Sequence, residues 1–314
     1  MTSEAGVQLG TGEHDMQLSK PGGTLTSGLA RILRRPVSQQ TLARASLHVL
    51  DWIGCAVFGA TTEPGRIIAR STEGSGPCHA MSAGRREAAA AAFLNGSLGN
   101  VLEMDDIHRT SILHPGPVVV PAAMAAAERE GASATAFLEG VVRGYEAVIR
   151  VGRSVGPGHY RHWHNTSTCG PFGSAAAVAS ILALDEQQIV WALGNAGTQA
   201  SGPWQCRLEG SMSKQLHTAR AAQAGLVAAD LAAGGFTGPT AILEGELGFY
   251  AAMCPDPSPD RVLEGSDDEW LIEQTSFKPW PACRHAHPTI DATLLIREQV
   301  DPDALAALTV RTYG

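Results

Sequence analysis

Runs of small residues at helical spacing constrain the fold of this chain more than any other feature. A run of alanines occupies REAAAAAFLNG, which begins at Arg86, and alanine and glycine dominate the faces of the segment Met212–Ala233. Alanine is the strongest helix former, and small side chains let neighbouring helices approach closely. Aromatic residues, which the strands of sandwiches and barrels favour, make up only 5% of the chain. The pattern predicts a mainly α-helical fold.

Several polar residues stand where helices are expected to begin. Ser38, Ser133 and Asp185 each precede an apolar helical pattern, and Gln188 completes a capping box with Asp185. We therefore expect helices to start at these three caps. The helix after Ser38 carries an apolar stripe of the kind found in amphipathic helices: Leu42, Leu47, Val49, Leu50 and Ile53.

Glycine pairs and a terminal apolar segment indicate where elements end. Asn95-Gly96 and Gly234-Gly235 are expected to stop the helices that precede them, because both residue types tolerate the left-handed backbone of a helix C-terminus. The segment Ala307–Gly314, with the sequence ALTVRTYG, is expected to form a β-strand.

A Pro- and Asp-rich segment, Cys254–Arg261, is the best candidate for a boundary between regions. Residues 1–23 are rich in Gly, Ser and Thr and predict a flexible leader. We expect one large helical domain over 24–260 and the beginning of a second region over 261–314, whose α/β character is implied only by the family resemblance given below.

Charge and cysteine use exclude several classes of protein. The formal net charge is −8 and no long basic run is present, so binding through a nucleic-acid backbone is not expected. No signal-peptide profile is found, and no apolar run approaches the ~18–20 residues of a membrane span. We expect a soluble, cytoplasmic protein with reduced thiols, because no CxxC pair links the cysteines, which are Cys55, Cys78, Cys169, Cys206, Cys254 and Cys283.

Polar residues gather in four segments between the apolar helices, whereas the usual motifs of dinucleotide, P-loop, zincin and α/β-hydrolase sites are absent. The segments are Gly99–Pro117 with Glu103, Asp105, Asp106, His108 and His114; Gly156–Gly173 with His159, His162, His164 and Thr168; Ser211–Arg220 with Lys214 and His217; and Phe277–His287 with Lys278, Cys283, Arg284, His285 and His287.

Each segment also has a purely structural interpretation. Asp105 and Asp106 could be helix N-caps, and the histidines of the second and fourth segments could lie in solvated loops. Lys214 and His217 are three residues apart and share a helix face. A lysine on an Ala-rich helix either extends to solvent or serves a pocket, and we favour the pocket.

Metal binding is a further alternative. The spacings H-x-x-H-x-H and C-x-H-x-H supply imidazole and thiolate groups, but neither matches a standard zinc pattern, and we expect no metal. Cations and helix N-termini can instead hold the carboxylates of a substrate while a histidine or carboxylate moves a proton. A carbanion beside a carboxylate needs positive charge close to it, which such a cleft supplies.

The chain resembles the MmgE/PrpD family, which includes 2-methylcitrate dehydratase, cis-aconitate decarboxylase and iminodisuccinate epimerase. The resemblance runs from about Leu25 to the end of the chain. Its wording is closest to the epimerase branch around GHY and WH-x-TST. It is carried, in the family's order, by AAFLNGSLGNVLEMDDIH, HPGPVVVPAAMAAAE, GYEAVIRVGR, HNTSTCGPFGSAAAVA, ALGNAGTQASG, MSKQLHTARAAQAG, GGFTGPTAILEGELGF and KPWPACRHAH.

The resemblance implies a large all-helical domain, an α/β lid, a site in the cleft between them, a homodimer, and no metal or organic cofactor. The family's two site histidines fall on His114 and His164, its two lysines on Lys214 and Lys278, and its acid before the Asp-Asp pair on Glu103. Family members continue well past Gly314, so we expect the lid to be incomplete or supplied by a second chain.

Some positions depart from the family's pattern. Asn100 replaces its usual histidine and Ile107 replaces a frequent threonine. Cys283 stands where the decarboxylase branch has a site histidine, which argues against that specific activity.

These observations predict an enzyme that needs no cofactor and acts on a small di- or tricarboxylic acid. It would remove a proton beside a carboxylate, as a dehydratase-like lyase or an epimerase. We expect catalytic roles for His164, His114, Lys214, Glu103 and Asp105, and substrate binding by Lys278, His217, Thr168 and Arg284. The alternative is a catalytically inactive helical scaffold or half-enzyme, and a metal hydrolase is a third option.

Overall fold

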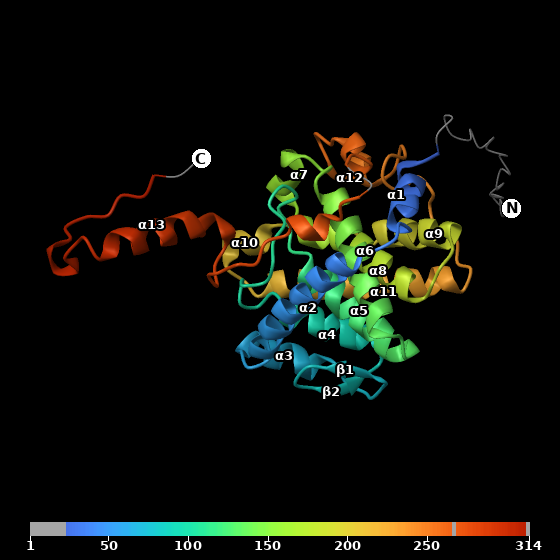
Figure 1. The fold of residues 1–314 in the computed structure, drawn as a ribbon, viewed down its shortest axis with the longest axis horizontal. Helices are drawn as coiled ribbons and strands as arrows, with labels where there is room; N and C mark the ends of the chain where they lie inside the picture. Colours follow the sequence, from blue (N-terminus) through green and yellow to red (C-terminus); the bar gives the residue numbers. More distant parts are fainter. Residues whose placement is uncertain (1–22, 266–267, 312–314) are drawn as a thin grey trace, which may run out of the picture.

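The computed structural model describes residues 23–265 and 268–311, and its described part is mainly helical, as expected (Figure 1). The elements run in chain order as α1 (Leu25–Leu33), α2 (Gln39–Gly59), α3 (Glu63–Ser71), β1 (Cys78–Ala80), β2 (Gly84–Arg86), α4 (Ala88–Leu98), α5 (Gly116–Glu130), α6 (Ala134–Gly152), α7 (Pro157–His162), α8 (Asn165–Ile181), α9 (Glu186–Gly197), α10 (Gln205–Glu209), α11 (Ser213–Ala233), α12 (Phe249–Met253) and α13 (His287–Arg297). The expected leader at 1–23 lies outside the described residues except for Gly23.

The sequence-predicted caps open their helices. The side chains of Ser38 and Ser133 accept hydrogen bonds from backbone N–H groups in the first turns of α2 and α6. Asp185 and Gln188 form the expected capping box of α9. Because each cap satisfies backbone donors that a helix leaves free, these three starts could be predicted from local sequence.

Helix α8 is the centre of the core. Nearly all of its residues are buried, and α5, α6, α9 and α11 pack around it (Figure 1). The contact with α11 is close enough to need glycine. A Cβ atom added at Gly225 would lie 2.5 Å from the carbonyl oxygen of Pro171 and from the backbone nitrogen of Ala175. The small residues that predict helices therefore also set how closely they pack.

The expected position of the apolar stripe on α2 is wrong in detail. In α2 the core face carries Ala45, His48 and Trp52, whereas Leu47 and Leu50 are 49% and 64% exposed. The expected apolar stripe is therefore largely on the outer face; of its members only Leu42 is buried, and the core face follows another line of residues that includes the large Trp52.

The expected stop at Asn95-Gly96 is also wrong, because α4 continues through both residues to Leu98. Asn95 is buried and its side chain bonds the backbone of His79 and Met81, and an added Cβ at Gly96 would contact α11. A tertiary contact, and not a helix end, accounts for this pair.

The strands differ from the prediction in two places, at residues 78–86 and at residues 307–311. β1 and β2 form an antiparallel hairpin that sequence reasoning missed, with Cys78 paired to Arg86 and Ala80 to Gly84. The strand expected over Ala307–Gly314 is wrong for residues 307–311, which form no strand; residues 312–314 lie outside the described part. A strand needs a hydrogen-bonding neighbour, and no described strand pairs with this segment.

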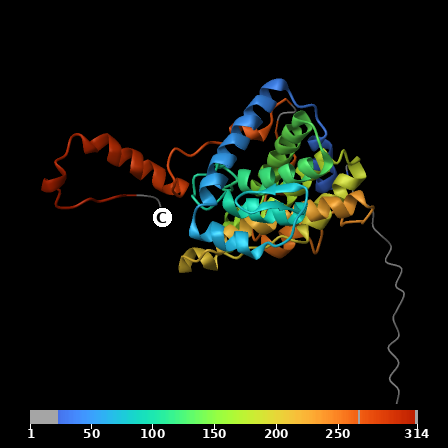
Figure 2. The same cartoon turned by 90° about the horizontal axis from the view of Figure 1, so that it is seen from below.

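The last described helix, α13, extends away from the helical body (Figures 1 and 2). It begins directly after the segment that closes one side of the cavity described below. Among the helices of the described residues, none combines the length and apolar character that crossing a membrane would take. All six cysteines are free thiols.

Candidate active site

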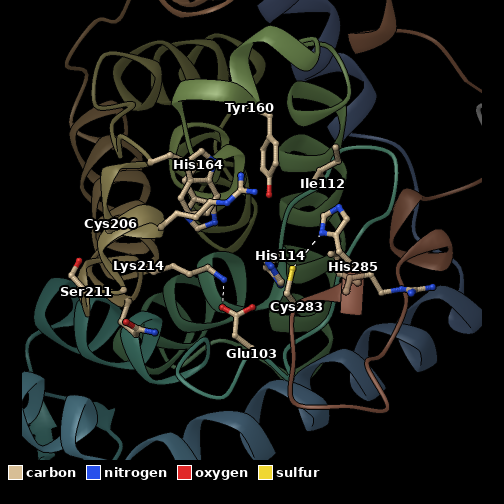
Figure 3. A pocket seen from close by; sticks show the side chains of 16 residues that line it. Glu103, Ile112, His114, Tyr160, His164, Cys206, Ser211, Lys214, Cys283 and His285 are labelled. Atoms are coloured by element: carbon tan, nitrogen blue, oxygen red, sulfur yellow. Dashed lines mark hydrogen bonds and ion pairs between the residues drawn. The ribbon is translucent and has the colours of Figure 1, made fainter. Parts of the chain in front are cut away.

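One cavity of about 410 Å³ receives side chains from all four polar segments (Figure 3). It lies beside the first turns of α8 and α11 and beside the loop that precedes α5. Its lining residues include acidic, basic and imidazole side chains, namely those of Glu103, His114, His164, Lys214, Arg284 and His285. Segments that are far apart in sequence thus meet where helices begin.

His164 stands immediately before α8, at its N-cap position. Its Nδ1 lies 3.2 Å from Nδ1 of His217, and Trp204 covers its ring at a centroid distance of 4.2 Å. Burial and then the charge of Lys214 lower the pKa of His164 well below its ordinary value. The imidazole is therefore neutral at neutral pH and able to accept a proton.

His114 is held through the other side of its ring. Its Nδ1 lies 3.0 Å from Oδ2 of Asp105 and 3.0 Å from the backbone oxygen of Asp106. Both neighbours are acceptors, so Nδ1 carries the hydrogen and, in the neutral ring, Nε2 keeps a lone pair. His114 can thus exchange a proton with a molecule in the cavity.

Asp105 is buried, with 1% of its surface exposed. Burial alone would raise the pKa of Asp105, but His114 and Lys278 outweigh it and hold the pKa well below its ordinary value. Asn100, one of the departures from the family's pattern, donates to Asp105 Oδ2 over 2.8 Å. Asp105 therefore orients His114 from behind and does not line the cavity.

Asp106 fixes the loop on which these residues stand. Its carboxylate accepts hydrogen bonds from the Tyr145 hydroxyl at 2.6 Å and from the backbone N–H of Gly116, the first residue of α5, at 2.9 Å. His48 contacts the same carboxylate at 2.7 Å. Asp106 therefore has a structural role, but its interpretation as a helix N-cap is wrong, because the N-cap position of α5 is Pro115.

Two lysines approach Glu103 from opposite sides. Lys214, on the first turn of α11, forms an ion pair with Glu103 Oε1 at the cavity wall. Lys278 is fully buried; its Nζ donates to the backbone oxygen of Glu103 over 2.5 Å and lies 3.7 Å from Oε2. Lys214 can reach a ligand directly, whereas Lys278 lies behind Glu103.

The fourth segment forms the wall opposite α11. Cys283, Arg284 and His285 line the cavity, and Cys283 Sγ lies 3.3 Å from His285 Nδ1 (Figure 3). The backbones of Ile107 and Ser276 exchange two hydrogen bonds, of 2.9 and 3.0 Å, which bring this segment against the loop that carries Glu103. Arg284 lines the cavity, and its role in substrate binding stays a prediction.

Three expected substrate contacts do not line the cavity: Lys278, which lies behind Glu103, and the two residues Thr168 and His217. Thr168 is fully buried, and its hydroxyl bonds Nε2 of His159 at 2.8 Å. His217 does not line the cavity but contacts His164 from behind. Both residues therefore support other side chains instead of contacting a ligand. Thr168 does so because the first turn of α8 points its side chain into the core.

Among the cavity residues that sequence reasoning missed are Tyr160 of α7 and, at α10, Trp204 and Arg207. The two aromatic rings meet edge to face at 5.8 Å, and the Arg207 guanidinium lies 5.9 Å from the Tyr160 ring. The W-Q-C-R sequence at 204–207 holds a large aromatic and a cation on a short exposed turn, which is the signal that could have drawn attention to them.

The histidines that suggested a metal separate in the structure. His159 bonds the core through Met253 and Thr168, His162 is exposed, and His164 faces the cavity. Within the ranges 23–265 and 268–311, no three His, Cys, Asp or Glu side chains gather in a way that could hold a metal ion.

Comparison with known proteins gives a family match and several relatives. A family model described as the MmgE/PrpD N-terminal domain matches residues 25–262. The chain is 30% identical over 298 residues to a cis-aconitate decarboxylase-like protein of Aspergillus oryzae, covering 87% of this chain and 62% of that protein. It is 27% identical to cis-aconitate decarboxylase of Aspergillus terreus, covering 82% of this chain and 56% of the relative.

The human cis-aconitate decarboxylase is 28% identical, with 84% of this chain and 57% of the relative aligned. The chain therefore spans a little over half the length of the curated relatives it matches.

Proposed function

Because the chain belongs to the MmgE/PrpD family, we propose that its cavity binds a small di- or tricarboxylic acid and moves a proton on the carbon beside a carboxylate. The activity is that of a lyase or an isomerase. The three relatives compared above carry the name cis-aconitate decarboxylase or a name like it, and that name supports a polycarboxylate as the substrate class.

A single observation carries the proposal: His164, His114 and Lys214 line one cavity although they come from three distant segments. Imidazoles with a free nitrogen can take up or deliver a proton. An ammonium group stabilises the negative charge that develops on the substrate when the proton leaves. Neither group can perform the reaction alone, so their convergence matters more than either residue.

The proposed first step is the removal of a proton from the carbon beside a carboxylate. One imidazole, which we assign to His164, takes the proton of the C–H bond, and the electron pair moves onto the adjacent carboxylate as an enediolate held by Lys214. The hydroxyl group of the neighbouring carbon then takes the proton that His164 now carries and leaves as water, which gives an unsaturated acid. If His114 starts with Nε2 protonated, delivery of that proton to the other face inverts the carbon instead, and each imidazole ends with the other's protonation state.

Decarboxylation reaches the same type of carbanion by loss of carbon dioxide, and a proton then quenches it. All three outcomes use the same cation, and decarboxylation needs only one of the two imidazoles, as the proton donor. Cys283, where the decarboxylase branch has a histidine, favours dehydration or epimerisation for this chain.

Deuterium exchange tests the proposal directly. The protein is incubated in D2O with 2-methylcitrate, citrate, cis-aconitate or iminodisuccinate, and exchange and products are followed by NMR. We expect exchange beside a carboxylate with at least one of these acids. His164→Gln should slow it by about 100-fold or more, the usual contribution of a general base.

The matched control is His162→Gln, which removes an exposed imidazole two residues away, outside the cavity. It should leave the exchange rate unchanged. A folded protein that exchanges none of the four acids would contradict the proposal and favour a non-catalytic scaffold.

A further inference from the structure

The carboxylate of Glu103 occupies the wall of the cavity where a substrate carboxylate would bind. It pairs with Lys214, the lysine that reaches the cavity (Figure 3). The residue therefore supplies, from the protein itself, the chemical group that the lysine would bind in a substrate. A ligand carboxylate and the Glu103 carboxylate compete for one ammonium group.

The backbone of Glu103 is held by a hydrogen bond, whereas its side chain is held only by ion pairs and is partly exposed. Glu103 has φ +55°, a left-handed conformation that is uncommon outside glycine, and Lys278 Nζ holds its carbonyl oxygen at 2.5 Å. The side chain keeps 27% of its surface exposed. Rotation about side-chain bonds can thus move the carboxylate without moving the loop.

The Glu103 carboxylate also has a second cationic neighbour in the same conformation, toward which it can move. Glu103 Oε2 lies 3.7 Å from Lys278 Nζ, and this ammonium group is fully buried, with Asp105 Oδ1 as its other acidic neighbour at 3.9 Å. The pair with Lys214 is partly exposed, since 21% of the lysine side chain meets solvent. Partly exposed ion pairs contribute little free energy, so this one can be exchanged for another anion.

We infer that Glu103 is a resident anion: it covers Lys214 in the empty cavity and is displaced toward Lys278 when a substrate carboxylate binds. The inference rests on the proposed function and deepens it by naming what selects the substrate class. No covalent bond changes. Glu103 acts as a specificity-determining residue and not as a base.

Displacement predicts selectivity for polyanions. A monocarboxylate would replace one carboxylate on Lys214 by another and gain little. A di- or tricarboxylate also brings charges that Arg207 and Arg284, two further cations on the cavity wall, can bind. Only a ligand with several carboxylates offsets the loss of the Glu103–Lys214 pair.

Calorimetric titration with two unreactive probes tests the inference. Tricarballylate carries three carboxylates with no hydroxyl group or double bond, and propionate carries one carboxylate. In Glu103→Gln, which keeps the size of the side chain and removes its charge, we expect propionate to bind about tenfold more tightly than in the unaltered chain. The preference for tricarballylate over propionate should shrink.

The control for a general change in charge is Glu209→Gln. Glu209 is exposed at the end of α10, beside the cavity, and bonds Gln205 instead of a lysine. It should leave both affinities within about twofold of their starting values. Equal gains in the two variants, or no gain for propionate in folded Glu103→Gln, would overturn the inference.

A double-mutant cycle tests the displaced position. Lys278→Met should weaken tricarballylate binding when Glu103 is present, because the displaced carboxylate loses its partner. The same change in the Glu103→Gln background should have little effect. Equal weakening in both backgrounds would show that Lys278 does not receive Glu103.

The outcomes separate this inference from the proposed function. Tricarballylate binding without deuterium exchange on any acid would leave the resident anion intact and contradict the catalytic proposal. Failure of tricarballylate to bind the unaltered chain would contradict both.

Discussion

Each histidine of the site is fixed through one nitrogen. Asp105 and the Asp106 carbonyl orient His114, and His217 orients His164. Holding one nitrogen leaves the other for chemistry and lowers the entropy lost when a substrate binds. The acids around these rings, Asp105 and Asp106, are buried behind the cavity and not in it.

His108 allows a prediction about acid stability. It is buried on the loop of the site, Nδ1 lies 2.8 Å from the Ser111 hydroxyl, and burial followed by the charge of Arg153 lowers its pKa to about 4. In the unfolded chain His108 has an ordinary histidine pKa of about 6.5, so between this pH and about 4 it binds a proton in the unfolded chain but not in the folded one. Stability should therefore fall as pH drops from about 6.5 toward 4.

At pH 5 the contribution from His108 is about 2 kcal/mol relative to pH 7.5. Urea unfolding at both pH values measures it. His108→Gln should lose less stability over this interval than the unaltered chain, and exposed His162→Gln should behave as the unaltered chain does. An unchanged pH dependence in His108→Gln would contradict the assignment of the proton.

At the scale of elements, close contact between helices sets the positions of the site residues. α8 carries His164 at its start and α11 carries Lys214 on its first turn, and both pack through small residues. Ser174 on α8 donates to the Ala221 carbonyl of α11 over 2.7 Å. A change in the separation of these helices would move the base relative to the cation.

Gly225→Ala tests this contact. The added methyl group would lie 2.5 Å from backbone atoms of Pro171 and Ala175, which cannot move without shifting α8. We expect a loss of about 1–3 kcal/mol in the free energy of unfolding, the usual cost of overpacking. Urea denaturation measures the change.

Gly54→Ala is the matched control, because Gly54 lies on the exposed face of α2 and an added Cβ would meet nothing within 4 Å. Alanine there should be neutral or add up to about 1 kcal/mol through helix propensity. If both variants were equally stable, the α8–α11 contact would not be as close as described.

At the scale of the whole molecule, the described chain consists of a helical body and a projecting arm. The body holds the cavity, and the arm begins at α13 and extends away from it (Figures 1 and 2). Leu295 and Leu308 on the arm are 75% and 56% exposed. The arm therefore adds little to the core that holds the site together.

Limited proteolysis tests this division. Trypsin should cleave after Arg297, at the exposed end of α13, before it cleaves at Arg150, which is buried in α6. The melting temperature of the trimmed protein should lie within a few degrees of that of the intact chain. A shift of that size corresponds to a change of about 1 kcal/mol in the free energy of unfolding. Cooperative unfolding on cleavage after Arg297 would contradict it.

Local sequence determined the features that depend on neighbours in the chain. The caps at Ser38, Ser133 and Asp185, the helical fold, and the four polar segments all follow from propensity and hydrogen-bonding rules that act within a few residues. The choice of His114, His164 and Lys214 came from the family resemblance, and their convergence was a hypothesis from the chemistry of the polar segments; the cavity contains all three.

Only the tertiary structure decided which side chains face the cavity. Thr168 and Lys278 belong to the right segments but point into the core or behind Glu103, and Arg207 enters from a short turn with no motif. The hairpin of β1 and β2, the continuation of α4 through Asn95 and the absence of a strand over 307–311 have the same origin. A side chain's direction and a strand's existence depend on partners distant in sequence, and spacing along the chain does not encode them.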